Sequence, residues 1–459
     1  MAVGPAVLRE IESGYDHAVV VFVGPDGYPV GVAADYRVDA DRGVVTLTPP
    51  AGEEVAPPAD AEVNVIVSHI RPQEHMGYDQ RRYVQLWGRL RRSEAGLELI
   101  PERFHTWDES KVPFFQYSEI SVPQAHRYLD ELGRARGRPI RPRLAFGWLA
   151  LRTTRAPFLT ATAVPVLLGI AAAALDGGWS FFLAGLTFLA GSFVHLGLNV
   201  ANDVFDTLSG ADAANTTPTQ FSGGSRVVHY GLVRLPALAA LSAAFYLAGI
   251  GLGLYLAART DFWPLFWLGA AGVVISVIYT APPFRLVHRG VGEIAVALGF
   301  GPIMLLGAYF VQAERFTFEA VYLSLPVAIL IALVLYVNEI PDRAGDGAAG
   351  KRTLPVRWSK TAVIRGYDVA VAVAYALIAV GAVTGILPRP TLIALTTIPM
   401  AVKVSGALRR DYDDPYALMF SGMGTNIKLH LFTGLLLFVG YLIAIGADRL
   451  LETVPVFLR

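Results

Sequence analysis

Two short stretches of the chain carry side chains whose types and spacing suit metal binding. The first runs from Asn199 to Asp212 (NVANDVFDTLSGAD) and the second from Asn338 to Asp346 (NEIPDRAGD). Each contains an asparagine four residues before an aspartate, a spacing that places both side chains on one face of a helix. Two oxygen-rich faces predict a site for Mg²⁺, which prefers a few carboxylates together with phosphate oxygens. The candidate metal ligands are Asn202, Asp203, Asp206, Asp212, Asp342 and Asp346.

Basic side chains occupy loops next to both acidic stretches. Arg226 follows the turn sequence Ser222-Gly223-Gly224, and Arg285, Lys351 and Arg352 lie in two later loops. A metal ion backed by Lys and Arg stabilises the negative charge that builds on a leaving diphosphate. The combination therefore favours an enzyme that acts on a diphosphate.

An alternative is that the aspartates are ordinary polar caps at helix ends. This alternative suits a single aspartate better than two matching clusters. It suits Asp203 best, because this residue lies a step around the helix from Asn202 and Asp206.

The composition places these motifs in a membrane protein. The chain has 459 residues, a formal net charge of zero, 54% hydrophobic residues and a mean hydropathy of +0.46. Such a composition is high in apolar residues for a soluble protein. The absence of cysteine excludes disulfides, zinc–thiolate sites and a cysteine nucleophile, and the zero net charge gives no reason to expect nucleic acid as a partner. Residues 1–143 hold 38 charged side chains and residues 144–459 hold the other 38, so the chain combines a polar part with an apolar one.

Nine apolar stretches of roughly 20 residues predict nine transmembrane helices. They cover residues 156–175, 179–206, 235–258, 263–280, 291–311, 318–338, 361–387, 391–408 and 427–447. With a cytoplasmic N-terminus, the inward flanks and loops carry 21 basic residues and the outward ones carry 5, as the positive-inside rule requires. The start of the chain lacks the pattern of a cleavable signal. We therefore expect a multi-pass protein of the cytoplasmic membrane, with its N-terminal domain and both acidic motifs on the cytoplasmic side.

Residues 152–447 resemble the UbiA superfamily of intramembrane prenyltransferases, most closely the branch that prenylates 1,4-dihydroxy-2-naphthoate in menaquinone biosynthesis. Members carry Asn-Asp-x-x-Asp and Asp-x-x-x-Asp motifs at the ends of two helices in a nine-helix bundle. The matching stretches are NDVFDTLSGAD (202–212), SGGSRV (222–227), YTAPPFRL (279–286), GPIMLLGAYFVQ (301–312) and DRAGDGAAGKRTLPVR (342–357). Gly210 stands where many members have a third aspartate, whereas Asp212 matches its place in the naphthoate branch.

The resemblance implies Mg²⁺-dependent transfer of a polyprenyl group from an isoprenyl diphosphate to an aromatic quinone precursor, with loss of the ring carboxylate as CO₂. It implies catalytic roles for Asp206, Asp342, Lys351, Arg226 and Tyr279. It also implies that Arg285, Arg352, Ser222 and Asn338 bind the diphosphate or the aromatic carboxylate. Tyr279 and Tyr309 are candidates for lining the path of the allylic cation, with plain aromatic packing as an equal alternative.

Two other functions stay open at this point. One is prenyl transfer to a different acceptor, and the other is transport of an anionic solute. Transporter sites lie near the midplane of the membrane, on broken helices. The acidic residues here lie at span ends on one side, beside basic loops, and this position favours the enzyme.

Residues 1–135 are expected to form a small, mostly-β domain with a closing helix. Apolar or alternating runs separated by turn residues predict short strands at 18–23, 28–36, 44–47, 62–68 and 83–90, and a helix at 122–132. The order of these elements and the Trp87-Gly88-Arg89 sequence resemble the pyridoxamine 5′-phosphate oxidase-like split barrel. That resemblance implies FMN or a related flavin between the subunits of a homodimer. A barrel without cofactor that serves dimerisation or regulation is the alternative.

The expected division of the chain has three parts. Residues 1–135 form the soluble split barrel, residues 136–155 form an Arg-rich linker on the membrane surface, and residues 156–459 form the all-α bundle. The five arginines between residues 134 and 143 favour contact with anionic lipid over nucleic acid.

Overall fold

The computed structural model describes residues 3–25, 27–50, 55, 62–72, 78–93, 96–112, 114–140, 146–215, 218–219 and 221–453. The chain falls into two compact units, Met1–Arg141 and Pro142–Arg459. Each unit has hydrophobic clusters of its own. The division at residue 141 lies inside the segment 136–155 that the sequence suggests as a linker.

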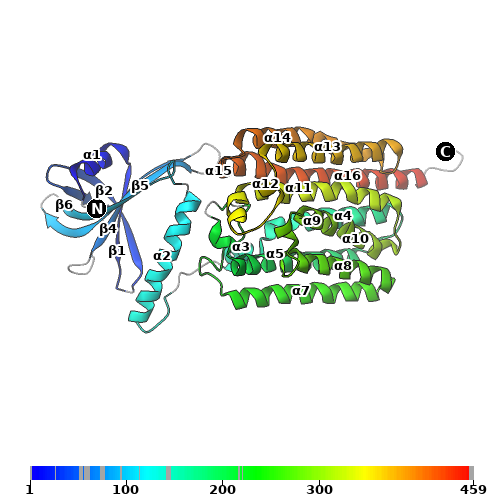
Figure 1. Cartoon of the computed structure of the whole chain (residues 1–459), viewed down its shortest axis with the longest axis horizontal. Coiled ribbons are helices and arrows are strands. Elements are labelled where there is room, and N and C mark those ends of the chain that lie inside the picture. The colour runs from blue at the N-terminus through cyan, green and yellow to red at the C-terminus, as the bar shows by residue number, and fades with distance from the viewer. Residues whose placement is uncertain are drawn as a thin grey trace. The chain divides into compact units, whose positions relative to one another are not determined.

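Six antiparallel strands close into a barrel in the first unit, in the spatial order β1-β2-β3-β6-β5-β4 (Figure 1). The strands are β1 (His17–Val23), β2 (Pro29–Asp39), β3 (Val44–Thr48), β4 (Val63–Pro72), β5 (Tyr78–Ser93) and β6 (Gly96–Asp108). Side chains alternate across the sheet, so Val20, Val65 and Leu86 are fully buried inside it. Helix α1 (Pro5–Gly14) adds Leu8 and Ile11 to the same core. The expected mostly-β domain is confirmed.

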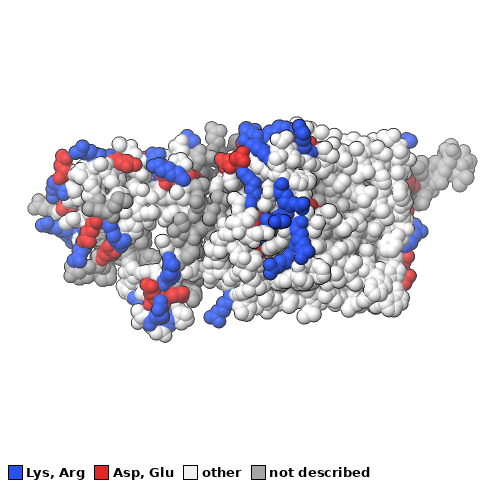
Figure 2. All heavy atoms as spheres, viewed as in Figure 1, with Lys and Arg blue, Asp and Glu red and all other residues white. Residues whose placement is uncertain are grey.

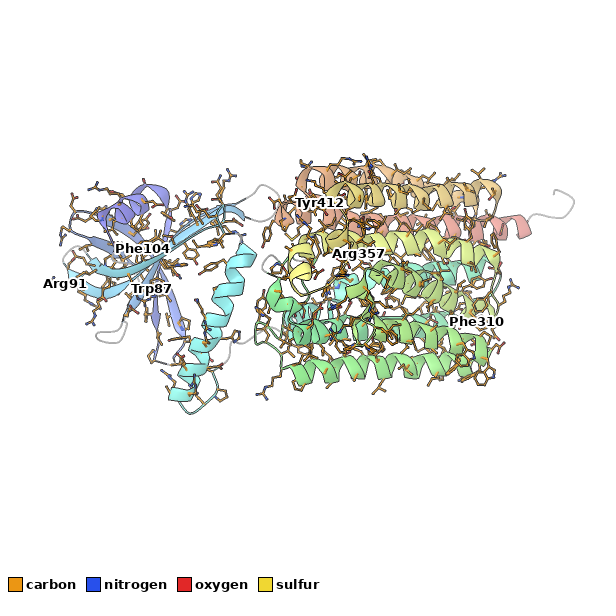
Figure 3. All side chains as sticks on the ribbon, in the orientation of Figure 1. Trp87, Arg91, Phe104, Phe310, Arg357 and Tyr412 are labelled. Atoms are coloured by element: carbon orange, nitrogen blue, oxygen red, sulfur yellow. The ribbon has the colours of Figure 1, made fainter. Side chains whose placement is uncertain are left out.

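The Trp87-Gly88-Arg89 sequence marks an irregularity between β5 and β6. The register of the two strands shifts between Trp87 and Gly88. A Cβ at Gly88 would lie 2.0 Å from the carbonyl oxygen of Ile100, so only glycine fits there. Trp87, labelled in Figure 3, packs under the guanidinium of Arg103 at 4.5 Å. Helix α2 (Phe114–Ala135) includes the predicted helix at 122–132.

Nine helical segments in the described part of the second unit are long and apolar enough to cross a membrane. They are η1–α4 (Ala156–Leu175), α5 (Phe181–Ser209), α7 (Leu235–Ala258), α8 (Phe262–Thr280), α9–α10 (Gly292–Ala313), α11 (Phe318–Ala348), α13 (Lys360–Thr384), η4–α14 (Arg389–Asp411) and α15–α16 (Pro415–Asp448). The long helices lie lengthwise in one bundle (Figure 1). The predicted nine-helix membrane bundle is confirmed.

Helices α5 and α11 continue beyond the ends that hydropathy predicts for them. The predicted spans end at residues 206 and 338, whereas the helices end at Ser209 and Ala348. The second acidic motif is therefore entirely helical, and the first is helical as far as Ser209, where Gly210 ends α5. A hydropathy count stops at the first polar cluster, but a helix continues where its polar side chains contact protein instead of lipid. Asp206, Asn338 and Glu339 are buried in this way.

The outer surface of the bundle suits a lipid environment. Figure 2 shows Lys, Arg, Asp and Glu gathered near the two ends of the second unit, with a broad band free of them between. Large apolar side chains are exposed along the helices, among them Leu247 on α7, Val274 on α8 and Val373 on α13. An exposed apolar surface of this extent marks a membrane-embedded protein. The chain is a multi-pass membrane protein.

Candidate active site

The two acidic motifs meet at the end of the bundle where α5 and α11 finish, here called the acidic end. The short helix α6 (Ala211–Ala214) packs against both α5 and α11 and brings Asp212 to the same place. A cavity of about 180 Å³ lies between them. Its lining includes Asn202, Asp206, Asp212, Asn338, Asp342, Asp346 and Lys351. Oxygen-bearing side chains of both motifs and the ammonium group of Lys351 therefore surround one polar cavity.

Lys351 links the two motifs. Its Nζ lies 2.8 Å from Asp206 Oδ1 and 3.5 Å from Asp346 Oδ1, and the side chain is almost entirely buried. Burial disfavours the charged ammonium, but the nearby carboxylates of Asp206, Asp346 and Asp342 outweigh burial and raise the pKa of Lys351. Lys351 is therefore a fixed cation inside the polar cavity.

Asp212 is a carboxyl group whose charge depends on its surroundings. Burial, followed by the negative charges of Asp206 and Asp203, raises the pKa of Asp212 to about 7. Thr207 Oγ1 donates a hydrogen bond to Asp212 Oδ2 at 3.3 Å. A cation placed beside Asp212 would favour its ionised form.

The loop that contains Ser222-Gly223-Gly224 crosses between the two acidic helices. Asp342 on α11 accepts hydrogen bonds from Gly223 N at 2.9 Å and from Asn215 Nδ2 at 2.8 Å. Asp203 on α5 accepts a hydrogen bond from Ser225 N at 3.1 Å. Gly224 has a φ of +71°, and a Cβ there would lie 3.0 Å from Asp203 Oδ1 and 3.2 Å from Asp212 Oδ1, so glycine is required. The loop therefore joins α5 to α11 through its backbone.

The cavity fits Mg²⁺ as an ion shared with a phosphate ligand. No three His, Asp or Glu side chains in the described part of the chain stand close enough together to hold a metal ion by themselves. Mg²⁺ does not need such a cage, because it completes its octahedral shell with water and phosphate oxygens. Asn338 Oδ1 is a buried oxygen without a hydrogen-bond partner among the described residues. This oxygen and the carboxylates around it are the donor type that Mg²⁺ takes.

An apolar chamber of about 430 Å³ continues from the polar cavity into the bundle. The two cavities share five lining residues, namely His195, Leu198, Tyr279, Val296 and Phe300. Helices α5, α7 and α8 and the π-turn η3 (Gly299–Ile303) supply most of the chamber wall. A polar cavity that opens into an apolar chamber suits a ligand with a charged head and a hydrocarbon tail.

Most of the residues singled out in the sequence lie at this site. Ser222 lines the polar cavity, and Tyr279 is buried where the polar cavity joins the chamber. Arg226 is buried in the same loop as Ser222, beyond the lining, and its charge acts on Asp212. Asp203 lies behind the lining, against Ser225.

Three of the candidates lie elsewhere. Arg285 is half-buried and Arg352 is exposed, and neither lines the polar cavity. Tyr309 lines neither cavity, because its hydroxyl donates to Asp176 at the opposite end of the bundle. This hydrogen bond supports the packing interpretation of Tyr309.

The structure adds lining residues that the sequence patterns did not single out. Arg155, Asn215 and Glu339 line the polar cavity. Arg155 belongs to the basic flank of the first span, where its charge indicates topology. Its position directly before an apolar stretch, on the same side as the acidic motifs, is the signal that could have marked it.

A model of the UbiA prenyltransferase family matches residues 162–445, nearly the whole helical bundle. The chain belongs to the UbiA prenyltransferase family. The 2-carboxy-1,4-naphthoquinone phytyltransferase of Synechocystis sp. is 29% identical over 296 residues, which cover 64% of this chain and 92% of that protein. The 1,4-dihydroxy-2-naphthoate octaprenyltransferase of Bacillus subtilis is 24% identical over 317 residues, which cover 69% of this chain and 99% of that protein. Membership confirms the predicted enzyme class, a prenyltransferase.

A solved structure of a UbiA homolog from Archaeoglobus fulgidus, bound to DMAPP and Mg²⁺, is also similar to this chain. Its sequence identity is 17% and its TM-score 0.47, over 63% of this chain and 98% of that one.

Proposed function

We propose that this UbiA-family member transfers a polyprenyl group from an isoprenyl diphosphate to 1,4-dihydroxy-2-naphthoate in menaquinone biosynthesis, with Mg²⁺ as cofactor. One observation carries the proposal: the polar cavity, which contains Lys351, adjoins the apolar chamber. The two cavities have five lining residues in common. The Bacillus relative, a 1,4-dihydroxy-2-naphthoate octaprenyltransferase, supports the naphthoate acceptor, and the Synechocystis relative acts on the related 2-carboxy-1,4-naphthoquinone.

The oxygen-bearing side chains of the cavity would hold the cofactor. Asn202, Asp206 and Asp212 contribute from the α5–α6 side, and Asn338, Asp342 and Asp346 contribute from α11. When bound, Mg²⁺ supplies positive charge that offsets the negative charge of the diphosphate. The six side chains belong to α5, α6 and α11, so the position of the diphosphate depends on how these three helices pack.

The remaining side chains of the site bind and orient the substrate. Lys351 and Arg155 present cationic groups to the diphosphate oxygens and stabilise the charge that develops as the allylic carbon–oxygen bond breaks. Tyr279 lies at the junction of the two cavities, where its ring face stabilises the carbocation-like carbon. The apolar chamber binds the hydrocarbon tail and keeps water from the cation.

The test is an assay of the purified enzyme in lipid nanodiscs. With Mg²⁺, an isoprenyl diphosphate and 1,4-dihydroxy-2-naphthoate, we expect equal amounts of released diphosphate and prenylated, decarboxylated product by mass spectrometry. EDTA should stop both. Diphosphate release that occurs only with another aromatic acceptor would overturn the naphthoate assignment, and no release with any acceptor would overturn the whole proposal.

For orientation, we propose the cytoplasmic membrane with the acidic end and the N-terminal unit in the cytoplasm. The support is the 21-to-5 distribution of basic residues over the two sides.

For the N-terminal unit, FMN binding and homodimer formation stay predictions that rest on the split-barrel resemblance. The barrel interior does not fit a flavin, because buried apolar side chains such as Val20, Leu47 and Leu99 fill it. A flavin would therefore lie outside the barrel, between two copies. Visible absorbance of the purified full-length protein and its mass in solution test the two predictions separately.

A further inference from the structure

Four arginines lie on the outer side of two loops at the acidic end, and the proposed mechanism leaves them without a role. They are Arg285, Arg289, Arg352 and Arg357, here called the arginine patch. Arg289, Arg352 and Arg357 are exposed and Arg285 is half-buried. Figure 2 shows Lys and Arg side chains gathered on this face, and Figure 3 labels Arg357 there. The patch comes from the turn η2 (Leu286–Arg289) with its flanks and from the segment that holds α12 (Leu354–Arg357).

The two segments of the patch are fastened to each other. Arg352 N donates a hydrogen bond to the carbonyl of His288 at 2.9 Å. Gly290 has a φ of +71°, and a Cβ there would lie 2.6 Å from the carbonyl oxygen of Arg352 and 2.9 Å from Arg357 Nη1. The guanidinium of Arg357 therefore lies against the Gly290 backbone. Arg289 Nη2 donates to the carbonyl of Pro283 at 2.9 Å.

The patch carries positive charge that no ion pair neutralises among the residues that the structure describes. None of its four arginines forms an ion pair with another residue that the structure describes. Other basic residues at this end do, since Arg343 and Lys360 pair with Asp413 at 2.9 and 2.8 Å. Burial lowers the pKa of His288, and the positive charges of Lys351 and Arg285 lower it further. The negative charge of Asp206 acts in the opposite direction but is outweighed. Four uncompensated guanidinium groups attract an anion.

The patch and the polar cavity lie on two sides of the same segments. Val287, between Arg285 and Arg289, lines the polar cavity, and so does Lys351, next to Arg352. Apolar side chains adjoin the patch in the sequence and are open to lipid, since Phe284 is 52% and Ile294 60% exposed. A molecule with a phosphate head and a hydrocarbon tail could bind here with its head on the arginines and its tail on the apolar surface.

We propose that the arginine patch is a capture site for the diphosphate head of the incoming isoprenyl substrate, which docks there before it enters the polar cavity. This inference rests on the proposed function and extends it to substrate entry. Charges outside a binding cavity raise the rate of encounter with an oppositely charged ligand and leave the bound complex nearly unchanged. The patch therefore acts on KM and on its salt dependence, and kcat does not depend on it.

The experiment uses the full-length enzyme in nanodiscs of phosphatidylcholine, with geranyl diphosphate as the probe. The variant is Arg289→Gln/Arg352→Gln/Arg357→Gln. At low ionic strength we expect KM for geranyl diphosphate to rise about tenfold, with kcat within about twofold of wild type. The difference in KM should shrink as salt rises toward 0.5 M, roughly, because the Debye length falls below the size of the patch.

The matched control is Arg234→Gln/Lys403→Gln/Lys428→Gln. It removes three exposed charges from the start of α7 and from α14 and α16, so the change in net charge is the same. We expect its KM to match wild type. An equal rise in KM for both triple variants would show that net charge alone matters and would overturn the capture site. An unchanged KM or a fall in kcat for the patch variant would also overturn it.

A second measurement separates this inference from the proposed function. The time course of binding of radiolabelled geranyl diphosphate needs no acceptor and no turnover, and its association rate should fall in the patch variant alone. If wild type binds the probe with that dependence but forms no product, the capture site holds and the naphthoate reaction fails. If the patch variant loses only copurified phosphatidylglycerol, with unchanged geranyl diphosphate association, the patch is a phospholipid site and the proposal is wrong.

Discussion

The ammonium group of Lys351 lies 2.8 Å from Asp206 Oδ1, although the two residues belong to different acidic motifs. The same ammonium reaches Asp346 Oδ1 at 3.5 Å. One lysine therefore neutralises carboxylates from α5 and α11 together, in the cavity where a metal–diphosphate group would bind. In the proposed mechanism, Lys351 is therefore both a ligand for the diphosphate and a competitor of Mg²⁺ for the carboxylates.

Replacement of Lys351 by glutamine should remove activity and strengthen metal binding. Loss of the cation takes away stabilisation of the leaving diphosphate, so we expect kcat to fall about 10²-fold or more. The carboxylates of Asp206 and Asp346 lose their partner, so Mg²⁺ should raise the melting temperature of this variant more than that of wild type. Thermal unfolding across a Mg²⁺ titration checks the second effect. An equal shift in both proteins would show that Lys351 and the metal do not share the carboxylates.

Asp206→Ala and Asp342→Ala should each abolish prenyl transfer while the protein stays folded and inserted. Both residues line the polar cavity, so each substitution removes a carboxylate that would hold Mg²⁺. Product formation and size-exclusion behaviour in detergent are the measurements. Asp413→Asn serves as control, because it removes a carboxylate from a surface ion pair with Arg343 and Lys360. Activity within a few-fold of wild type in either alanine variant would remove that aspartate from the metal set.

Asp203 can be separated from the metal ligands by two substitutions. Its Oδ1 accepts a hydrogen bond from Ser225 N at 3.1 Å, behind the lining of the cavity. Asp203→Asn keeps an oxygen acceptor, so its Mg²⁺ requirement should match wild type. Asp203→Ala leaves the amide of Ser225 unpaired, which costs about 1–3 kcal/mol and should raise hydrogen exchange in the Ser222–Arg226 loop. If the asparagine variant instead needs a Mg²⁺ concentration about tenfold higher than wild type, a difference of about 1.4 kcal/mol, Asp203 is a metal ligand.

Gly253 offers a way to shorten the apolar chamber. It lines the chamber, and a Cβ there would meet no atom within 4 Å, so a side chain can start at this position and extend into the chamber. Gly253→Leu should slow transfer of long isoprenyl groups and leave short ones unaffected. Gly251 is the matched control, because it has the same open space on the same helix but does not line the chamber. Equal rates with long and short substrates in the Gly253 variant would mean that the tail does not bind in this chamber.

Nine spans require the two ends of the chain to lie on opposite sides of the membrane. A reporter fused before Met1 should be cytoplasmic, and one fused after Arg459 should be extracytoplasmic. Reporter activity in intact cells checks this. Both ends on one side would show that one of the nine helices does not cross, with Arg389–Asp411 the first suspect, since its mean hydropathy of 1.5 is lower than that of the other spans.

Much of the architecture could be predicted from local patterns. Apolar runs of roughly 20 residues marked the nine spans, because a helix that faces lipid cannot tolerate many polar side chains. Alternating apolar and polar residues, as in the run 83–90, marked strands of the barrel, since one face of the sheet packs inward. The Asn202–Asp206 and Asn338–Asp342 pairs marked the polar cavity, because i, i+4 spacing fixes a shared helix face.

Only the tertiary structure decided which of these side chains meet. Lys351 enters the polar cavity while Arg352, one residue later, points to the surface patch. Asp203 faces Ser225 while Asp206, three residues later, faces Lys351. Arg155 joins the lining from the start of a different helix. The physical reason is that sequence periodicity specifies the local backbone and the relative faces of one element, whereas contacts between elements depend on how each helix is rotated and packed against the others.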